Sequence, residues 1–398
     1  MKSRAVHFAI AVAAVACLFP SALRAQDIDV WNHTIAFHGF ATQAGIYTSG
    51  NNWLTMDTDN GSGAFTEMGL NVSTNLSDKF RFGAQVYDHN IGQLGQWHPG
   101  LDWATLTFKY KRWLSFRGGK DKTTLGLFTD SQDLDFVHPF ALLPQGIYPI
   151  DLRDATIAHA GGDIYGTIAL GHKYGSVTYT AWGGRRYDSI YSGYPYFLQT
   201  RGIETTSYGG PQFGGDLRWN TPLKGLLLGV SRMNQYITGL GIIEATGGPN
   251  EEHSKHDGTT DFYGEYNYKN FTLDGEYRRY VRDQIIINNT AEDIGDFRGW
   301  YFAGSYRFTK WFQLGSYYSH FTAASSFLQI TAAMPQGHDY DKVVTGRFDI
   351  DRFWNIKVEG HFMAGYAASA FPNGFYPQQN PTFVPNTDAL VLMTNFNF

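Results

Sequence analysis

The chain has 398 residues, with 36 Asp and Glu against 31 Lys and Arg, and this acidic balance argues against a nucleic-acid partner. It combines 45 Gly, 25 Tyr, 30 Phe and 10 Trp with a negative mean hydropathy of −0.30. This combination is typical of membrane β-barrels, in which only alternate residues meet lipid and aromatic residues mark both interfaces. A soluble secreted β-protein is the alternative on composition alone.

Residues 1–25 have the pattern of a secretory signal peptide. Lys2 and Arg4 precede an apolar run, Pro20 ends that run, and a short segment of small residues leads to Ala25. The run is too short to span a membrane as a helix, so we expect cleavage after Ala25. Removal of three of the 31 basic residues would leave 28 Lys and Arg against 36 acids, a net charge of −8.

The expected mature chain, residues 26–398, has no cysteine, because Cys17 lies in the signal peptide. Disulfides and thiol chemistry are therefore excluded. No mature segment approaches the roughly 18 apolar residues of a transmembrane helix. We expect a single domain without a cofactor or a metal, built from strands.

Apolar and polar residues alternate with a period of two along the mature chain. Phe80, Phe82 and Ala84, for example, alternate with Arg81 and Gly83. This alternation predicts half-buried β-strands. The predicted strands are 33–47, 64–75, 80–90, 103–111, 113–128, 163–173, 176–186, 208–220, 225–238, 260–269, 271–284, 297–308, 311–321, 341–350, 354–367 and 387–398.

The connections between these strands fall into two length classes that alternate. Seven short turns lie near residues 75–78, 111–112, 173–175, 220–224, 269–270, 309–310 and 351–352. Eight long loops cover approximately residues 49–63, 90–102, 130–162, 187–207, 239–259, 285–296, 322–340 and 368–386. An even number of strands, with short periplasmic turns and long extracellular loops, predicts an all-β fold, a transmembrane antiparallel barrel of sixteen strands.

The last strand alternates up to its final residue. Leu390 and Leu392 would face lipid together with Phe396 and Phe398, while Asn395 would face the lumen. A closed barrel requires its last strand to pair with its first, so we expect an ordered C-terminus.

The third loop, residues 130–162, is the longest and has an unusual composition. Apolar residues such as Phe140, Leu142 and Ile147 suit a loop that folds against the inner wall better than one in water. A loop that covers the barrel mouth or supports a neighbouring subunit is the alternative. The acids of this loop are Asp130, Asp133, Asp135, Asp151 and Asp154.

The segments 119–128 and 140–148 resemble the fifth strand and third loop of trimeric porins from Gram-negative outer membranes. The resemblance implies a homotrimer in contact with lipid and lipopolysaccharide. It also implies that Phe398 and Phe396 form a signal for the outer-membrane assembly machinery. In this family the third loop enters the lumen and sets acids against basic residues of the wall.

The predicted function is a water-filled channel for passive diffusion of small hydrophilic solutes and ions. Its selectivity would be set where the five loop acids face the basic wall. The basic candidates on lumen-facing positions are Arg81, Lys109, Arg117, Arg278, Arg307 and Arg347.

Other functions remain open. A channel selective for sugars or anions would use the lumen-facing aromatic or basic residues. A barrel enzyme is less favoured, because Ser319 and His320 are neighbours in a strand and point to opposite faces. A surface adhesin would use the long loops. Within residues 251–256, two acids and two histidines could bind a cation, although a solvated charge cluster is the simpler interpretation.

Overall fold

The computed structural model describes residues 26–30, 33–292, 295–325, 329–367 and 374–398; the predicted signal peptide lies outside the described residues. The strands are β1 Gln26–Val30, β2 His33–Thr48, β3 Ser62–Asn75, β4 Phe80–Ile91, β5 Gly100–Lys111, β6 Leu114–Lys122, β7 Ala158–Gly171, β8 Gly175–Tyr187, β9 Ile203–Asn220, β10 Leu226–Gln235, β11 Thr238–Ile243, β12 Gly248–Tyr268, β13 Phe271–Ile287, β14 Thr290–Glu292, β15 Asp296–Arg307, β16 Phe312–Ala324, β17 His338–Asp349, β18 Trp354–Gly365 and β19 Asn386–Asn397. The helices are η1 Thr129–Ser131, η2 Arg153–Ala155, α2 Gly193–Gln199 and η3 Pro335–Gly337.

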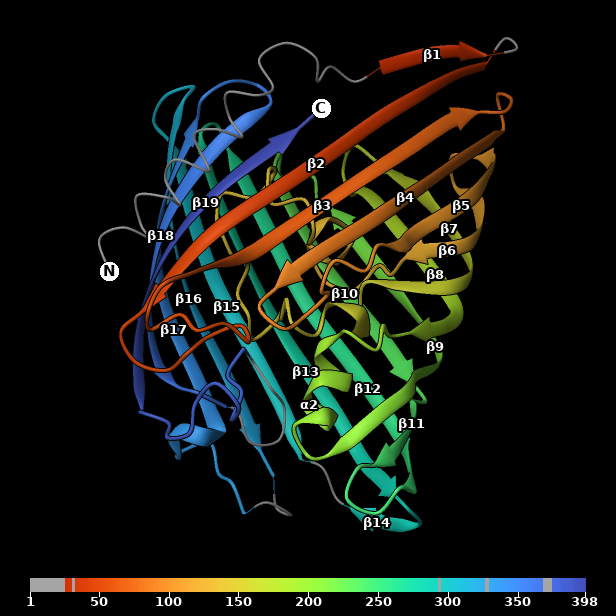
Figure 1. Cartoon of the computed structure of the whole chain (residues 1–398). Coiled ribbons are helices and arrows are strands. Elements are labelled where there is room, and N and C mark those ends of the chain that lie inside the picture. The colour runs from red at the N-terminus through yellow and green to blue at the C-terminus, as the bar shows by residue number, and fades with distance from the viewer. Residues whose placement is uncertain (1–25, 31–32, 293–294, 326–328, 368–373) are drawn as a thin grey trace.

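These strands form one closed antiparallel wall (Figure 1). The ring closes where β19 pairs with β2. β10 and β11 together form one interrupted strand, because both pair with β9 and with β12. β1 and β14 are short additions that pair with β2 and β13. Within the described residues the wall is therefore a barrel of sixteen strands, which confirms the predicted fold class.

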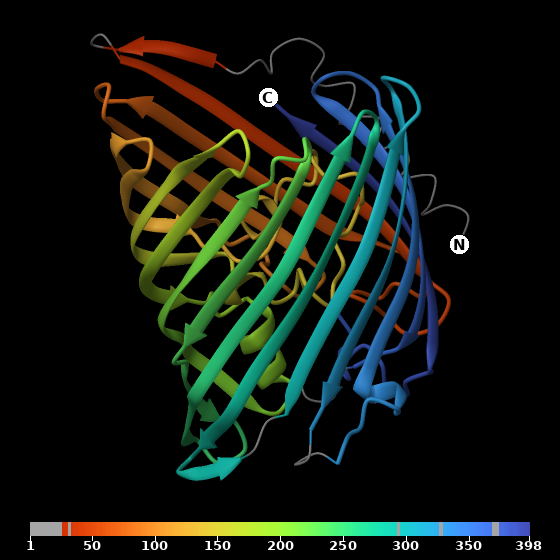
Figure 2. The same cartoon turned by 180° about the vertical axis from the view of Figure 1, so that it is seen from behind.

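The two ends of the barrel differ. The short turns and the C-terminus lie at the upper end in Figures 1 and 2, and α2 and β14 lie at the lower, long-loop end. The C-terminus is fixed by two backbone hydrogen bonds, from the Phe398 N–H to the Gly39 carbonyl at 3.0 Å and from the Gly39 N–H to the Phe398 carbonyl at 3.1 Å. The last strand thus closes the barrel, as its alternation predicts.

Two predicted segments differ most from the structure, and β7 and β9 also begin earlier than predicted, at Ala158 and Ile203 instead of residues 163 and 208. The predicted strand 113–128 ends at Lys122, because Leu125 continues the apolar pattern by packing inside the barrel against Trp182 and Met233. The predicted loop 239–259 is mostly β11 and the first part of the 21-residue β12. Polar residues on both faces remove the period-two signal there, whereas the backbone still pairs.

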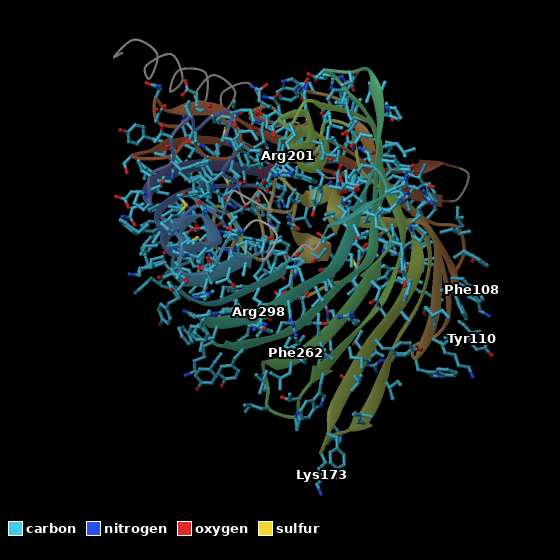
Figure 3. The ribbon with its side chains drawn as sticks, turned by 90° about the horizontal axis from the view of Figure 1, so that it is seen from below. Phe108, Tyr110, Lys173, Arg201, Phe262 and Arg298 are labelled. Atoms are coloured by element: carbon cyan, nitrogen blue, oxygen red, sulfur yellow. The ribbon has the colours of Figure 1, made fainter. Side chains whose placement is uncertain are left out.

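The outer face is apolar and aromatic. Figure 3 shows Phe108, Tyr110 and Phe262 on this surface. Directly paired outward residues form an aromatic row across five strands: Phe262, Tyr277, Trp300, His320 and Tyr340. The row runs obliquely, from Phe262 nearer the short-turn end of β12 to Tyr340 at the long-loop end of β17, and an aromatic outer surface of this kind suits a membrane barrel. Among the described residues, the helices are all too short or too polar to cross a membrane.

The interior contains buried apolar clusters formed by the third loop. Phe140, Ile147 and Tyr148 of this loop pack against Tyr301 and Tyr317 of the wall. Further along, Leu152 and Ala155 join a second cluster, and Ala141 and Leu142 join a third with residues of β2, β3, β18 and β19. The apolar residues of the loop are therefore explained by burial inside the barrel.

Candidate functional site

The third loop, residues 123–157 in the structure, is bound to one side of the lumen. The carboxylate of Glu359 on β18 accepts hydrogen bonds from the backbone N–H groups of Ala141 at 2.8 Å and Leu142 at 2.9 Å. Lys357 on the same strand donates to the Phe140 carbonyl at 2.6 Å. Both wall side chains are fully buried. We call the wall from β13 to β18 the covered wall, because the loop lies on it.

Three of the predicted wall bases contact this loop or lie near the short-turn end of the covered wall. Arg278 is bound to Asp261 at 2.7 Å and Glu276 at 3.1 Å, and it donates to the Ile147 carbonyl. Arg347 donates to the His138 carbonyl at 3.1 Å. Arg347 and Arg307 share Asp349, at 2.7 and 2.6 Å. Arg278 and Arg347 thus hold the loop.

The opposite wall, from β3 to β7, is not covered in this way. A hollow of about 470 Å³ lies against it, which we call the lower hollow. It brings together Arg81, Lys109 and Arg117 from the wall and Asp130 from the loop. Its lining also includes Asn71, Ser73, Gly83, Gln85, Trp103, Thr105, Thr107, Asp121, Lys122, Leu134 and Tyr165. We call this side the open wall.

A second hollow of about 390 Å³ lies along the same side toward the long loops. We call it the upper hollow, because upper and lower here refer to an orientation with the long loops at the top, the reverse of Figure 1. Its lining includes Asp102 and Lys120 from the open wall, Arg153 and Asp154 from the third loop, and Tyr191 from the segment before α2. The two hollows adjoin at an ion cluster, because Lys122 lines the lower hollow and its partner Asp102 lines the upper one.

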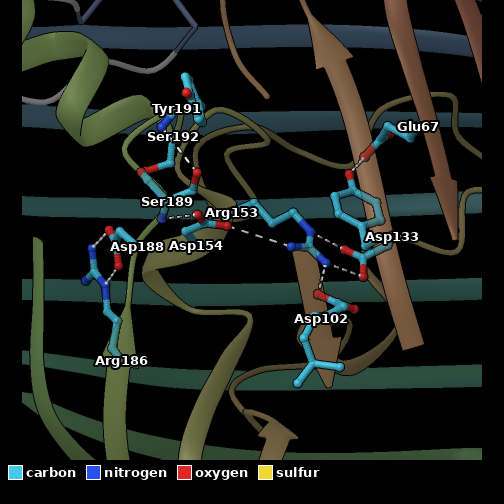
Figure 4. Close-up of polar contacts among 12 residues, drawn as sticks. Glu67, Asp102, Asp133, Arg153, Asp154, Arg186, Asp188, Ser189, Tyr191 and Ser192 are labelled. Atoms are coloured by element: carbon cyan, nitrogen blue, oxygen red, sulfur yellow. Dashed lines mark hydrogen bonds and ion pairs between the residues drawn. The ribbon is translucent and has the colours of Figure 1, made fainter. Parts of the chain in front are cut away.

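The ion cluster consists of two acids, Asp102 and Asp133, and two bases, Arg153 and Lys122. Figure 4 shows Arg153 with its two acids. The Arg153 guanidinium binds Asp133 at 2.7 Å and Asp102 at 2.6 Å. Lys122 binds Asp102 at 3.2 Å and also contacts Asp133. The Arg153 guanidinium lies 4.0 Å from the centre of the Tyr87 ring. The cluster has no net charge and joins the third loop to β5 and β6.

The charges in this cluster fix the protonation of Asp133. Burial by itself would raise the pKa of Asp133, but the neighbouring Arg153 and Lys122 outweigh burial and lower that pKa well below its usual value. Asp133 is therefore ionised under all physiological conditions. Removal of either base would leave a buried carboxylate with one cationic partner fewer.

The other predicted loop acids lie elsewhere. Asp135 is buried, and burial raises its pKa to about 6 despite the opposing charge of Lys357. Asp151 accepts hydrogen bonds from the Tyr376 hydroxyl at 2.8 Å and the Gly374 N–H at 3.0 Å, and burial raises its pKa to about 6.

Asp154 likewise connects the third loop to a neighbouring loop. Its carboxylate accepts a hydrogen bond from the Ser189 N–H at 2.9 Å (Figure 4). Asp151 thus anchors the loop, and Asp154 anchors it and also lines the upper hollow. Asp130 lines the lower hollow, and Asp133 belongs to the ion cluster between the two hollows. Arg117 pairs with Asp121 at 2.5 Å and Asp163 at 2.8 Å, which are wall residues.

Sequence reasoning missed Asp102, Lys122 and Arg153. Arg153 belongs to the loop itself, and Lys122 is the last residue of β6. Strand parity gives no direction for residues at such places. The one available signal was the pair of bases Lys120 and Lys122, which flank Asp121. The predicted strand 113–128 assigned these residues to faces by strict alternation from Arg117, which placed Lys120 and Lys122 on the lipid-facing side.

Two weaker candidates can also be placed. Ser319 is buried inside the wall, whereas the ring of His320 stacks on Trp300 in the outer aromatic row, so the two face opposite sides. His253 and Glu251 form a pair at 2.7 Å, with both side chains largely exposed. The described residues contain no group of three or more His, Cys, Asp or Glu placed to hold a metal.

No family model matches the sequence, and no curated protein is significantly similar to it. Solved structures do match. An anion-selective porin from Comamonas acidovorans aligns with a TM-score of 0.57 at 12% identity, over 92% of this chain and 100% of that chain. OmpF of Salmonella typhi, solved with daunomycin, aligns at 0.57 and 13%, over 94% and 100%. The chain has the porin fold.

The trimer form of OmpT, an outer membrane protein of Vibrio cholerae, shares this porin fold. It aligns with a TM-score of 0.54 at 12% identity, over 92% of this chain and 99% of that chain. The porin fold thus accounts for nearly the whole described barrel. At these identities the likeness is one of fold, and the chemistry of the lumen must be argued from its own residues.

Proposed function

We propose that this protein is an outer-membrane porin, a water-filled channel for passive diffusion of small hydrophilic solutes and ions. The observation that carries the proposal is the asymmetric position of the third loop. The loop fills the lumen beside the covered wall and leaves two polar hollows along the open wall. A solute that crosses would pass from the upper hollow to the lower one beside the ion cluster of Asp102, Lys122, Asp133 and Arg153.

We further propose that the open wall sets the selectivity. Arg81, Lys109, Arg117 and Lys122 line the lower hollow, against Asp121 and Asp130. Ion pairs with carboxylates already neutralise Arg117 and Lys122, so the excess positive charge comes from Arg81 and Lys109 against Asp130. A water-filled passage with excess positive charge raises the local concentration of anions. This favours a modest preference for anions.

The setting of the channel is part of the proposal. The apolar outer face and its aromatic row suit an outer membrane, with the long loops outside the cell and the short turns in the periplasm. A homotrimer is supported by the trimer form of a structural neighbour. We expect contact with lipopolysaccharide at the aromatic row, and recognition of Phe396 and Phe398 by the assembly machinery.

The test is electrical conductance of purified, refolded protein in a planar lipid bilayer. We expect stepwise conductance increases, in groups of three for a trimer, and a reversal potential on the anion side in a salt gradient. Folding is verified separately by the β-sheet circular dichroism spectrum. Correctly folded protein that inserts without conductance would contradict the channel and would favour an enzyme or an adhesin.

A further inference from the structure

A third hollow, of about 260 Å³, lies at the long-loop end between α2, the loop after β4 and the start of β9. We call it the mouth hollow. Tyr191 lines both the mouth hollow and the upper hollow, so the two are adjacent. The ring of Tyr191 stacks on His98 at 3.8 Å between ring centres, which fixes its orientation.

The lining of the mouth hollow differs in chemistry from the linings of the upper and lower hollows. It contains three glutamines, Gln93, Gln96 and Gln199, and the rings of Tyr191 and Tyr196. Primary amides both donate and accept hydrogen bonds, and aromatic rings offer a flat apolar face. Pockets that orient a ligand combine a few such polar groups with apolar surface.

The charge of this lining is low. Among the described residues that line the mouth hollow, Glu204 alone carries a charge at neutral pH. Lys and Arg are absent from these described lining residues, in contrast to the lower hollow with its four bases. The mouth hollow is therefore unsuited to an anion and suited to an uncharged ligand rich in hydroxyl groups.

Thr205 supplies an independent observation. Its hydroxyl oxygen is buried and has no hydrogen-bond partner within the described part of the chain. An irregularity in the pairing of β9 with β11 leaves Thr206 opposite no residue, between Ser207 and Thr205. Such a bulge shifts the alternation by one position, and it places Thr205 rather than Thr206 on the side of the hollow.

A buried hydroxyl without a partner costs free energy, and rotation about the Cα–Cβ bond of Thr205 can turn its hydroxyl into the hollow that the residue lines, where a ligand can bind it. We propose that the mouth hollow is a binding site for a neutral saccharide. Thr205 and Gln199 would hydrogen-bond the sugar hydroxyls, and Tyr191 would lie against a ring face. The volume is slightly below the about 300 Å³ at which pockets for drug-sized ligands begin, so it suits one or two sugar rings.

The test measures binding to detergent-solubilised, folded protein, so its result does not depend on conductance. Isothermal titration calorimetry would use the disaccharides maltose, cellobiose and sucrose as neutral probes and gluconate as an anionic one. We expect saturable binding of at least one neutral saccharide and weaker binding of gluconate, which Glu204 repels. Binding of none of the three neutral probes, or tighter binding of gluconate, would overturn the proposal.

Two variants locate the site. Thr205→Val keeps the shape of the side chain and removes the hydroxyl, so we expect saccharide affinity to fall about threefold to tenfold. Its unfolding midpoint without saccharide should be unchanged or higher, because an unsatisfied buried hydroxyl is lost. Gln199→Ala should also weaken binding, whereas Gln336→Ala, in η3 of another loop, should not. Equal affinity in all three variants and the wild type would place the saccharide elsewhere and refute this site.

Discussion

The covered wall and the open wall carry similar residues but use them differently. On the covered wall, Glu359, Lys357 and Arg278 are buried and bind backbone groups of the third loop. On the open wall, Arg81 and Lys109 remain exposed to the lumen and line the lower hollow. The path of the third loop therefore decides whether a charged side chain that faces the lumen binds the loop or is available to solutes. The position of that side chain on its strand does not distinguish these two roles.

The largest effect is expected from Glu359→Ala on the covered wall. The change removes the acceptor for the Ala141 and Leu142 N–H groups and the 3.1 Å partner of His361. Loss of one member of a buried charged network costs about 3–5 kcal/mol. We expect a lower guanidinium midpoint of unfolding and, because the loop is released, a larger single-channel conductance.

Glu359→Gln is the matched control, because its amide oxygen can still accept one of the two N–H groups. It should lose less stability than the Ala variant. If Glu359→Ala left both the midpoint and the conductance at wild-type values, the loop would be held by other contacts, and the contrast between the two walls would fail.

The distinction between the walls is also where prediction from sequence ends. Alternation was enough to predict the sixteen strands and the closure at Phe398, and the apolar composition of the third loop, with residues such as Phe140, predicted its inward course. The same parity rule placed Arg81 and Arg278 in one class of lumen base. Only the tertiary path of the third loop separates them, because that path depends on many distant contacts that have no local pattern.

The ion cluster shows the same limit on a smaller scale. Asp133 was a predicted site residue, but its strongest partner, Arg153, comes from its own loop, twenty positions along the chain. Within a loop no period relates two side chains, so neither the pairing nor its burial can be predicted. Lys122 was missed for a related reason, because strict alternation from the lumen-facing Arg117 would place this last residue of β6 on the lipid-facing side.

A second prediction concerns pH and the anchor of the loop at Asp151. Its pKa is raised to about 6 by burial, compared with about 3.9 in an unfolded chain. Between about pH 4 and 6 the unfolded chain loses this proton before the folded protein does. The free energy of unfolding should therefore fall as pH rises through this window, by up to about 3 kcal/mol from this group.

Denaturant titrations of wild type and Asp151→Asn across this pH range measure that contribution. The Asn variant keeps an oxygen for the Tyr376 hydroxyl and the Gly374 N–H but has no proton to lose. Its stability should decline less with rising pH, while the contribution of Asp135 persists in both proteins. Parallel curves for the two proteins would show that Asp151 titrates alike in the folded and unfolded chains.

The smallest effect is expected from two substitutions that change the charge of the ion cluster in opposite directions. They test most directly whether permeating ions pass beside the open wall. Asp133→Asn leaves the cluster with one extra positive charge, and Arg153→Gln leaves it with one extra negative charge. A unit charge about 4 Å from a passing ion in water contributes about 1 kcal/mol. The anion-to-cation permeability ratio should therefore rise about twofold to fivefold in the first variant and fall similarly in the second.

Reversal potentials in a salt gradient measure both changes, and Asp351→Asn in an exposed short turn serves as the control. Opposite shifts from two residues that bind each other are difficult to attribute to loosening of the loop, because loosening would move both variants in one direction. Shifts of the same sign would thus assign the cluster to loop stability alone. In that case Asp133 and Arg153 would resemble Glu359 and Lys357, and the passage would have to be sought farther along the open wall, beside Lys109.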